Sequence, residues 1–148
     1  MVNEGGHGFY RVGYGRTLLA PLLRAPTETL AAIERFNLVS DAWAATVAGM
    51  LPVADFLELT GRFRHEADRQ VWASLLASFG YLARVAPTDL RPGLEALVRD
   101  RLGDATRRCG WSSRAEESDL DRELRGELLR TIGPLGNARE RASESRVG

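Results

Sequence analysis

The chain contains no lysine, a single cysteine and two histidines among its 148 residues. All of its basic residues are therefore arginines, and the twenty arginines are balanced by twenty aspartates and glutamates. A formal net charge of zero gives no general attraction to a phosphate backbone or to an anionic lipid surface. We expect neither a nucleic-acid partner nor a membrane partner, and we attribute the missing lysine to coding bias rather than to chemistry.

The scarcity of histidine and cysteine argues against metal and thiol chemistry. A protein zinc site takes three or four ligands, mostly from such residues, whereas His7 lies in a glycine-rich lead and His65 precedes an expected helix. Cys109 cannot form an internal disulfide, which agrees with a reducing compartment, and a free cysteine is typically a small buried apolar side chain. We therefore predict no catalytic, no cofactor-binding and no metal-binding residue in this chain.

Long apolar segments are missing as well. No run approaches the ~20 residues of a membrane span, and the N-terminus lacks the apolar core of a signal peptide. Hydrophobic residues make up 44% and charged residues 27% of the sequence, which is a globular composition. We expect a soluble, cytoplasmic chain with the size of one ordinary domain.

Helical periodicity dominates from Arg16 onward, with breaks at Pro26, Pro52, Pro87 and Gly110. Short apolar rows predict three of the helices, and Ser118 begins an S-x-x-D capping pattern ahead of the last one. These rows are Phe56, Leu57, Thr60 and Phe63; Leu90, Leu94, Leu97 and Val98; and Leu120, Leu124, Leu128 and Ile132. Because the loops are short, we expect consecutive helices to be antiparallel neighbours.

Two further helices, over residues 28–50 and 68–85, carry two apolar faces each. The faces of the first are Phe36, Trp43, Val47 and Met50, and the smaller Leu38, Ala42, Ala45 and Gly49. The rows of the second are Val71, Leu75 and Leu82, and Trp72, Leu76 and Phe79. Since two apolar faces require two packing neighbours, we predict a mostly α fold, a HEAT-like antiparallel helical array (α-α superhelix), rather than a compact four-helix bundle.

The N-terminal residues follow a different pattern. Phe9 to Tyr14 mix aromatic and β-branched residues behind a glycine-rich lead, which is typical of a β-strand. A single strand leaves a row of backbone groups unpaired. We therefore expect one orphan N-terminal strand before the helical array, with its partners in sequence upstream of this chain.

The stretch RHEADRQ, residues 64–70, contains the first half of the zinc-peptidase motif H-E-x-x-H. The position of the second histidine is Arg69, which cannot ligate a metal. We read Glu66 and Asp68 instead as acids at a helix entry, where the helix dipole favours them. Other charged residues, Glu34, Arg35 and Asp41, are compatible either with helix-surface pairs or with a buried network between layers.

Six blocks in a fixed order carry a family resemblance. They are VNEGGHGFYRVGY at 2–14, ERFNLVSDAWAATVAG at 34–49, FLEL at 56–59, EADRQVW at 66–72, CGW at 109–111 and ESDLDRELR at 117–125. Together they resemble the C-terminal region of the zinc aminopeptidases, the group of aminopeptidase N, the puromycin-sensitive aminopeptidase and the endoplasmic reticulum aminopeptidases. The resemblance covers nearly the whole chain.

The resemblance implies a domain order. Residues 1–15 would be the last strand and link of an upstream β-sandwich, and residues 16–148 a partial C-terminal α-helical domain, truncated after about residue 137. In this family the zinc helix lies in a separate upstream domain, so Glu66 would align with a structural acid. Cys109 stands where the family tends to have an apolar residue, which favours its burial.

The resemblance also implies a function. We expect a non-catalytic C-terminal helical domain that shapes and gates the peptide substrate chamber of a zinc-dependent aminopeptidase, a hydrolase whose zinc is bound by the missing catalytic domain. Its partners would be the catalytic and β-sandwich domains and the peptide substrate, and the chain alone should be inactive. The alternatives are a free-standing helical-repeat module that binds a peptide or protein, and an enzyme that uses Cys109 or His65.

Overall fold

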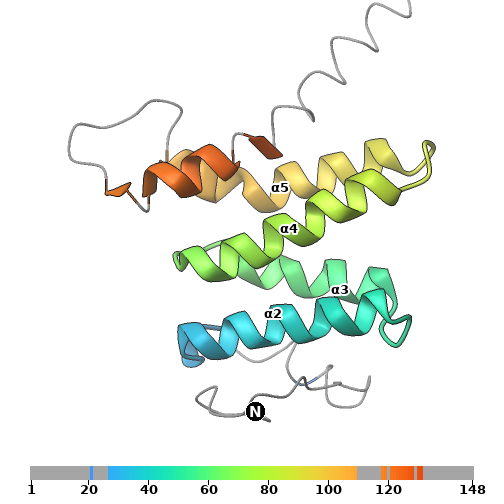
Figure 1. Ribbon diagram of the computed structural model, residues 1–148, viewed down its shortest axis with the longest axis horizontal. Coiled ribbons are helices and arrows are strands. Elements are labelled where there is room, and N and C mark those ends of the chain that lie inside the picture. The colour runs from blue at the N-terminus through green and yellow to red at the C-terminus, as the bar shows by residue number, and fades with distance from the viewer. Residues whose placement is uncertain (1–20, 22–26, 110–117, 120, 129, 132–148) are drawn as a thin grey trace, which may run out of the picture. The chain divides into compact units, whose positions relative to one another are not determined.

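The computed structural model describes residue 21 and residues 27–109, 118–119, 121–128 and 130–131. Within these ranges every regular element is helical (Figure 1), which confirms that the fold is mostly α. The expected strand at residues 9–14 lies outside the described residues. The chain divides into two compact units, Met1–Leu75 and Leu76–Gly148.

The first unit is built around two antiparallel helices, α2 (Ala32–Val47) and α3 (Val53–Thr60), which lie side by side (Figure 1). The α2 helix ends in a Schellman turn, because the amide of Met50 donates to the carbonyl of Ala45 at 2.9 Å and that of Gly49 to Thr46 at 3.0 Å. Gly49 has φ 73°, a conformation that favours glycine. The prediction that Gly49 belongs to a packed face was therefore wrong, since this residue ends the helix.

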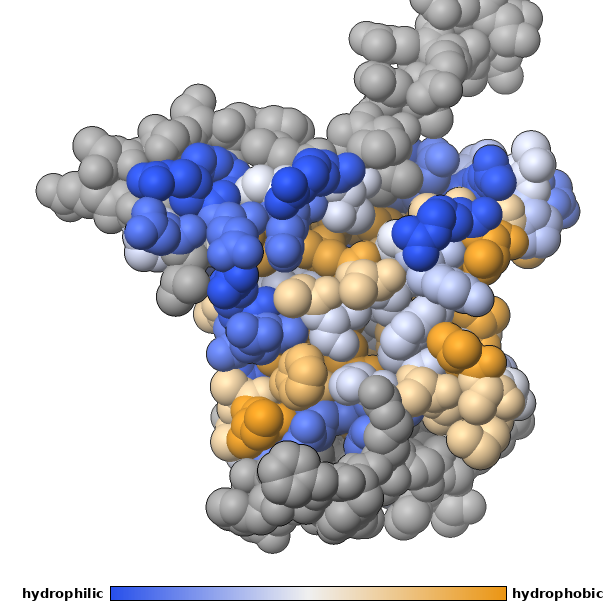
Figure 2. All heavy atoms as spheres, viewed as in Figure 1, coloured by the Kyte–Doolittle hydropathy of each residue, from blue (hydrophilic) through white to orange (hydrophobic). Residues whose placement is uncertain are grey.

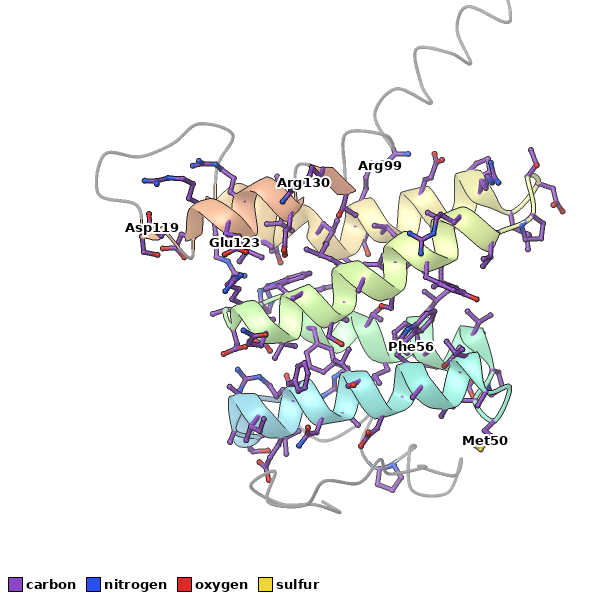
Figure 3. All side chains as sticks on the ribbon, viewed as in Figure 1. Met50, Phe56, Arg99, Asp119, Glu123 and Arg130 are labelled. Atoms are coloured by element: carbon purple, nitrogen blue, oxygen red, sulfur yellow. The ribbon has the colours of Figure 1, made fainter. Side chains whose placement is uncertain are left out.

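The two expected faces of α2 differ in burial. The small-residue face is confirmed as core, since Leu38, Ala42 and Ala45 are at most 5% exposed. On the other face Val47 and Met50 are 58% and 71% exposed, and Met50 points outward from the end of the α2–α3 connection (Figure 3). Both lie at the helix end, where the described part of the first unit supplies no covering neighbour.

The centre of the same face does pack. Phe36 and Trp43 are half-buried, and the rings of Trp43 and Phe56 lie 5.1 Å apart between their centroids (Figure 3). In α3 and the following 3-10 turn η3 (Gly61–Phe63), the predicted row is confirmed except at Leu57, which is half-buried. Leu59, which the row omitted, is fully buried.

Helix α4 (Arg69–Val85) crosses from the first unit into the second. The two predicted rows are confirmed as buried except at Leu82, which is half-buried. The carboxylate of Asp68 caps the helix, accepting hydrogen bonds from the amides of Gln70 at 2.8 Å and Val71 at 3.1 Å. This confirms that RHEADRQ contains a helix entry.

Replacing Asp68 with alanine should lower the free energy of unfolding by about 1 kcal/mol, because two amides at the start of α4 lose their acceptor. The change can be measured by urea denaturation followed by far-UV circular dichroism. Asp68→Asn, which keeps an amide oxygen at the cap, is the matched control and should retain most of the stability. Equal losses in both variants would contradict a capping role.

In the second unit, residues 76–85 of α4 and helix α5 (Arg91–Cys109) run in opposite directions (Figure 1), with Pro87 in the loop between them. The expected row of α5 is only partly core, since Leu90 is 61% exposed whereas Val98 is buried. The buried face continues through Leu102 and Ala105, which the row omitted. No described helix combines the length and apolarity required to cross a membrane.

A last helical segment of the second unit includes residues 121–128. The Ser118 hydroxyl accepts a hydrogen bond from the amide of Asp121 at 3.1 Å and donates to its carboxylate at 2.7 Å, so the predicted cap is confirmed. Leu124 and Leu128 are buried as expected. The side chains of Leu120 and Ile132 lie outside the described residues.

Candidate functional site

The half-motif His65-Glu66 does not lie on a helix. Both residues belong to the connection between η3 and α4, and α4 begins only at Arg69. His65 is exposed whereas Glu66 is 5% exposed, so the two side chains have different environments. The zinc motif requires both of its histidines on one helix face. The local structure at residues 65–69 therefore does not fit a zinc ion.

Described residues donate four hydrogen bonds to the Glu66 carboxylate. Arg35 donates from Nε to Oε2 at 2.7 Å and from Nη2 to Oε1 at 2.9 Å, a two-pronged ion pair. The amides of Ala67 and Asp68 donate to Oε1 at 2.9 and 2.7 Å. The Glu66 side chain is only 2% exposed and that of Arg35 19%, so this pair is largely shielded from water.

Two further bonds connect this pair to its surroundings. Arg35 donates from Nη1 to the carbonyl of Leu30 at 2.7 Å, and Trp72 donates from its indole nitrogen to the carbonyl of Glu66 at 2.9 Å. We call Leu30, Arg35, Glu66 and Trp72 the Arg35–Glu66 cluster. It joins the segment before α2, helix α2, the η3–α4 connection and the first turn of α4, all within the first unit.

The protonation of Glu66 follows from these contacts. Burial alone would raise the pKa of its carboxyl group, but the hydrogen bonds from Arg35, Asp68 and Ala67 and the positive charge of Arg35 outweigh burial, so the pKa lies below its ordinary value of 4.5. Because protonation would disrupt these bonds, the group is poorly suited to act as a general base. The cluster therefore connects four segments of the first unit through largely buried hydrogen bonds.

A small cavity of about 180 Å³ lies beside the cluster. Its lining comprises Thr27, Arg35, Arg62, Phe63, His65, Glu66 and Ala67. The charged groups of Arg35 and Glu66 in its wall already bind each other. Across the described residues, no three histidine, cysteine or acidic side chains are grouped as metal ligands. His7 and the thiol of Cys109 lie outside the described residues.

The structure decides between the alternatives for the other charged residues. Arg35 belongs to a buried network, and Glu34 accepts a hydrogen bond from the amide of Ala31 at 2.9 Å at the start of α2. Asp41 is 7% exposed, which agrees with the buried alternative. The partnership of Arg35 with Glu66 was missed because 31 residues separate them. No local signal indicated that Glu66 is buried, because the stretch around it, RHEADRQ, is almost entirely polar.

Comparison with known proteins identifies relatives. The ERAP1-like C-terminal domain family matches residues 1–146. Aminopeptidase M1 of Arabidopsis thaliana is 30% identical over 140 residues, which are 92% of this chain and 16% of that protein. Aminopeptidase N of Lactococcus lactis is 26% identical, covering 99% of this chain and 18% of its own length. Glutamyl aminopeptidase of Sus scrofa is also 26% identical, with coverages of 93% and 15%.

The matched region makes up only a small part of each relative. The chain spans about a sixth of the length of these curated aminopeptidases. The family match nevertheless covers almost all of the chain itself, in agreement with the resemblance drawn from its six sequence blocks. The chain belongs to the ERAP1-like C-terminal domain family.

Proposed function

We propose that this chain is the non-catalytic C-terminal helical domain of a zinc-dependent aminopeptidase, in which it shapes and gates the peptide substrate chamber of a catalytic domain in the same polypeptide. The observation that carries the proposal is the family match over residues 1–146. It is supported by the aminopeptidase names of the relatives and by the small share of each relative that the chain covers. The parent enzyme would be cytoplasmic.

The Arg35–Glu66 cluster supports a non-catalytic role. Glu66, the acid next to His65 in the zinc-like stretch, accepts hydrogen bonds from four donor groups. Its carboxylate therefore serves to connect α2 with the start of α4. Any zinc would then be bound by the catalytic domain, outside this chain. A wall of helices tied by such buried bonds would be stiff, as a chamber wall that restricts access must be.

We further propose that the helices stack as a HEAT-like antiparallel array. Two antiparallel pairs support this arrangement, α2 with α3 in the first unit and residues 76–85 of α4 with α5 in the second. Each pair resembles one layer of a helical repeat (Figure 1). Residues 1–15 would be the last strand and link of a β-sandwich, and residues 16–148 part of the helical domain. A structure of the complete parent polypeptide would test both assignments.

The chain alone should not hydrolyse aminoacyl p-nitroanilides, with or without added zinc, because its one histidine-glutamate pair lacks both the helix and the second ligand that zinc needs. The measurement is release of p-nitroaniline by the purified chain, with the complete Lactococcus lactis relative as positive control. Turnover that a chelator abolishes would contradict the proposal.

Gating can be tested in the complete parent polypeptide. We would delete the region equivalent to this chain and compare kcat/KM for a dipeptide-sized substrate and for a peptide of about ten residues. A chamber wall contacts the distal part of long peptides. Deletion should therefore lower the ratio of kcat/KM for the long peptide to kcat/KM for the short substrate at least about tenfold. Equal losses on both substrates would indicate a purely structural contribution.

The second candidate is a free-standing helical-repeat module. It is favoured by the exposed apolar side chains Val47, Met50 and Val53 around the α2–α3 connection, since such surfaces often bind other proteins. Immunoblotting of the native source with an antibody against residues 27–109 separates the two candidates. A module would migrate near 16.3 kDa, whereas a parent enzyme would be about six times longer, because the matched residues make up 16% of the Arabidopsis relative.

A further inference from the structure

The second unit contains an apolar pocket that the proposed function does not use. Its volume is about 340 Å³, within the range of small-molecule sites. Residues 79, 80, 83 and 84 of α4, residues 91, 94, 95 and 98 of α5 and residues 130–131 line it. Its apolar wall consists of Phe79, Gly80, Ala83, Leu94 and Val98.

The apolar wall is fixed on both helices. Phe79 is 1% exposed and Val98 3%, so both are anchored in the core of the second unit. Gly80 leaves open space beside them, because a Cβ atom added there would meet no atom within 4 Å. An apolar group could therefore enter the pocket at Gly80 without displacing the core.

The rim of the pocket is positively charged. Arg84, Arg91 and Arg130 line it together with one acid, Glu95. Glu95 already has a partner, since its carboxylate lies 3.8 Å from Nη2 of Arg99. None of the three rim arginines forms an ion pair with another residue in the described ranges.

The other contacts of the rim arginines leave donors available. Arg84 places its guanidinium 5.8 Å from the ring centre of Tyr81, and Arg91 donates from Nε to the carbonyl of Ala86 at 3.1 Å. Arg130 is exposed beside α5 (Figure 3). Hydrophilic and hydrophobic residues lie next to each other over α4 and α5 on the face that Figure 2 shows. The site therefore combines an apolar interior with an anion-attracting edge.

We propose that this pocket binds a small amphipathic carboxylate, whose apolar chain lies against Phe79, Gly80 and Val98 and whose carboxylate is bound by the rim arginines. Guanidinium groups match a carboxylate in geometry as well as in charge. Burial of the chain supplies most of the affinity, because the exposed arginines are screened by water and salt. The charge at the rim selects anions over neutral or cationic amphiphiles.

The test uses the complete 148-residue chain and decanoate as the probe, with binding measured by isothermal titration calorimetry. Two comparison ligands separate the contributions, acetate having the charge without the chain and decyltrimethylammonium the chain with the opposite charge. We expect decanoate to bind at least about tenfold more tightly than either, and its affinity to fall with added salt. Equal binding of decyltrimethylammonium, or no binding of decanoate, would overturn the proposal.

Variants locate the site. Gly80→Leu fills the pocket and should weaken decanoate binding at least about tenfold, whereas Gly80→Ala, which adds one methyl group to the same helix, should retain most of the affinity. The double variant Arg91→Gln/Arg130→Gln should no longer prefer decanoate over decyltrimethylammonium. Arg107→Gln, which removes a positive charge at the far end of α5, is the control and should keep this preference. Circular dichroism monitors folding, and Ala83→Leu replaces Gly80→Leu if that variant does not fold. Unchanged affinity in the folded pocket-filling variant refutes this site.

Discussion

Substituting Glu66 with glutamine is expected to lower the free energy of unfolding by about 3 kcal/mol. Glutamine has nearly the same shape but carries no charge, so Arg35 would remain as a largely buried cation without its counter-ion. The change can be measured by urea denaturation of the purified chain, followed by far-UV circular dichroism. Glu58→Gln, an exposed position on α3, is the matched control and should change stability by less than about 0.5 kcal/mol.

The pH dependence of that difference provides an independent check. The folded-state pKa of Glu66 is lowered from 4.5, so the unfolded chain binds a proton more readily than the folded one. The stabilisation by Glu66 is therefore fully present above pH 4.5 and is lost as the pH falls through the lower, folded-state pKa. The stability gap between the wild type and Glu66→Gln should be constant near neutral pH and narrow in acid. A gap that widens in acid would contradict the assigned ion pair.

Truncating Trp72 to alanine should lower the free energy of unfolding by about 4 kcal/mol. Trp72 is 1% exposed and is the largest fully buried side chain of the described residues, so its removal leaves a cavity. The same substitution removes the indole donor from the carbonyl of Glu66. Urea denaturation again supplies the measurement, with the second unit as an internal reference if the two units unfold separately.

Trp72→Phe separates the two contributions. Phenylalanine keeps much of the apolar volume but leaves the Glu66 carbonyl without its donor, so a loss of about 1–2 kcal/mol is expected. A Trp72→Ala loss below about 1 kcal/mol would show that the first unit collapses around the missing side chain, and would contradict close packing at this position.

Local sequence patterns predicted most of the helical elements. Pro52 and Pro87 do lie between helices, and Ser118 does cap. Helix α4 begins directly after Asp68, and the rows through Val71 and Trp72 are buried except at Leu82. These features depend on residues within about one or two helical turns of each other, so their spacing along the chain contains the necessary information.

The errors concern features that spacing does not encode. Apolar periodicity placed Val47 and Met50 on a packed face, but whether a helix face is covered depends on where the neighbouring helix lies. From the sequence, Gly49 could be either a core position of the small-residue face or the residue that ends the helix. Only the backbone conformation, with φ 73°, distinguishes the two.

The sequence by itself determined the mostly α composition, the main helix boundaries, the helix cap at Ser118 and, through six ordered blocks, the family. Only the tertiary structure decided that Glu66 is bound by Arg35, that Trp72 donates to the Glu66 carbonyl, and that an arginine-rimmed pocket lies between α4 and α5. The physical reason is the range of the interactions. Helix formation and capping are local, whereas a buried ion pair or a pocket depends on side chains that only chain folding brings together.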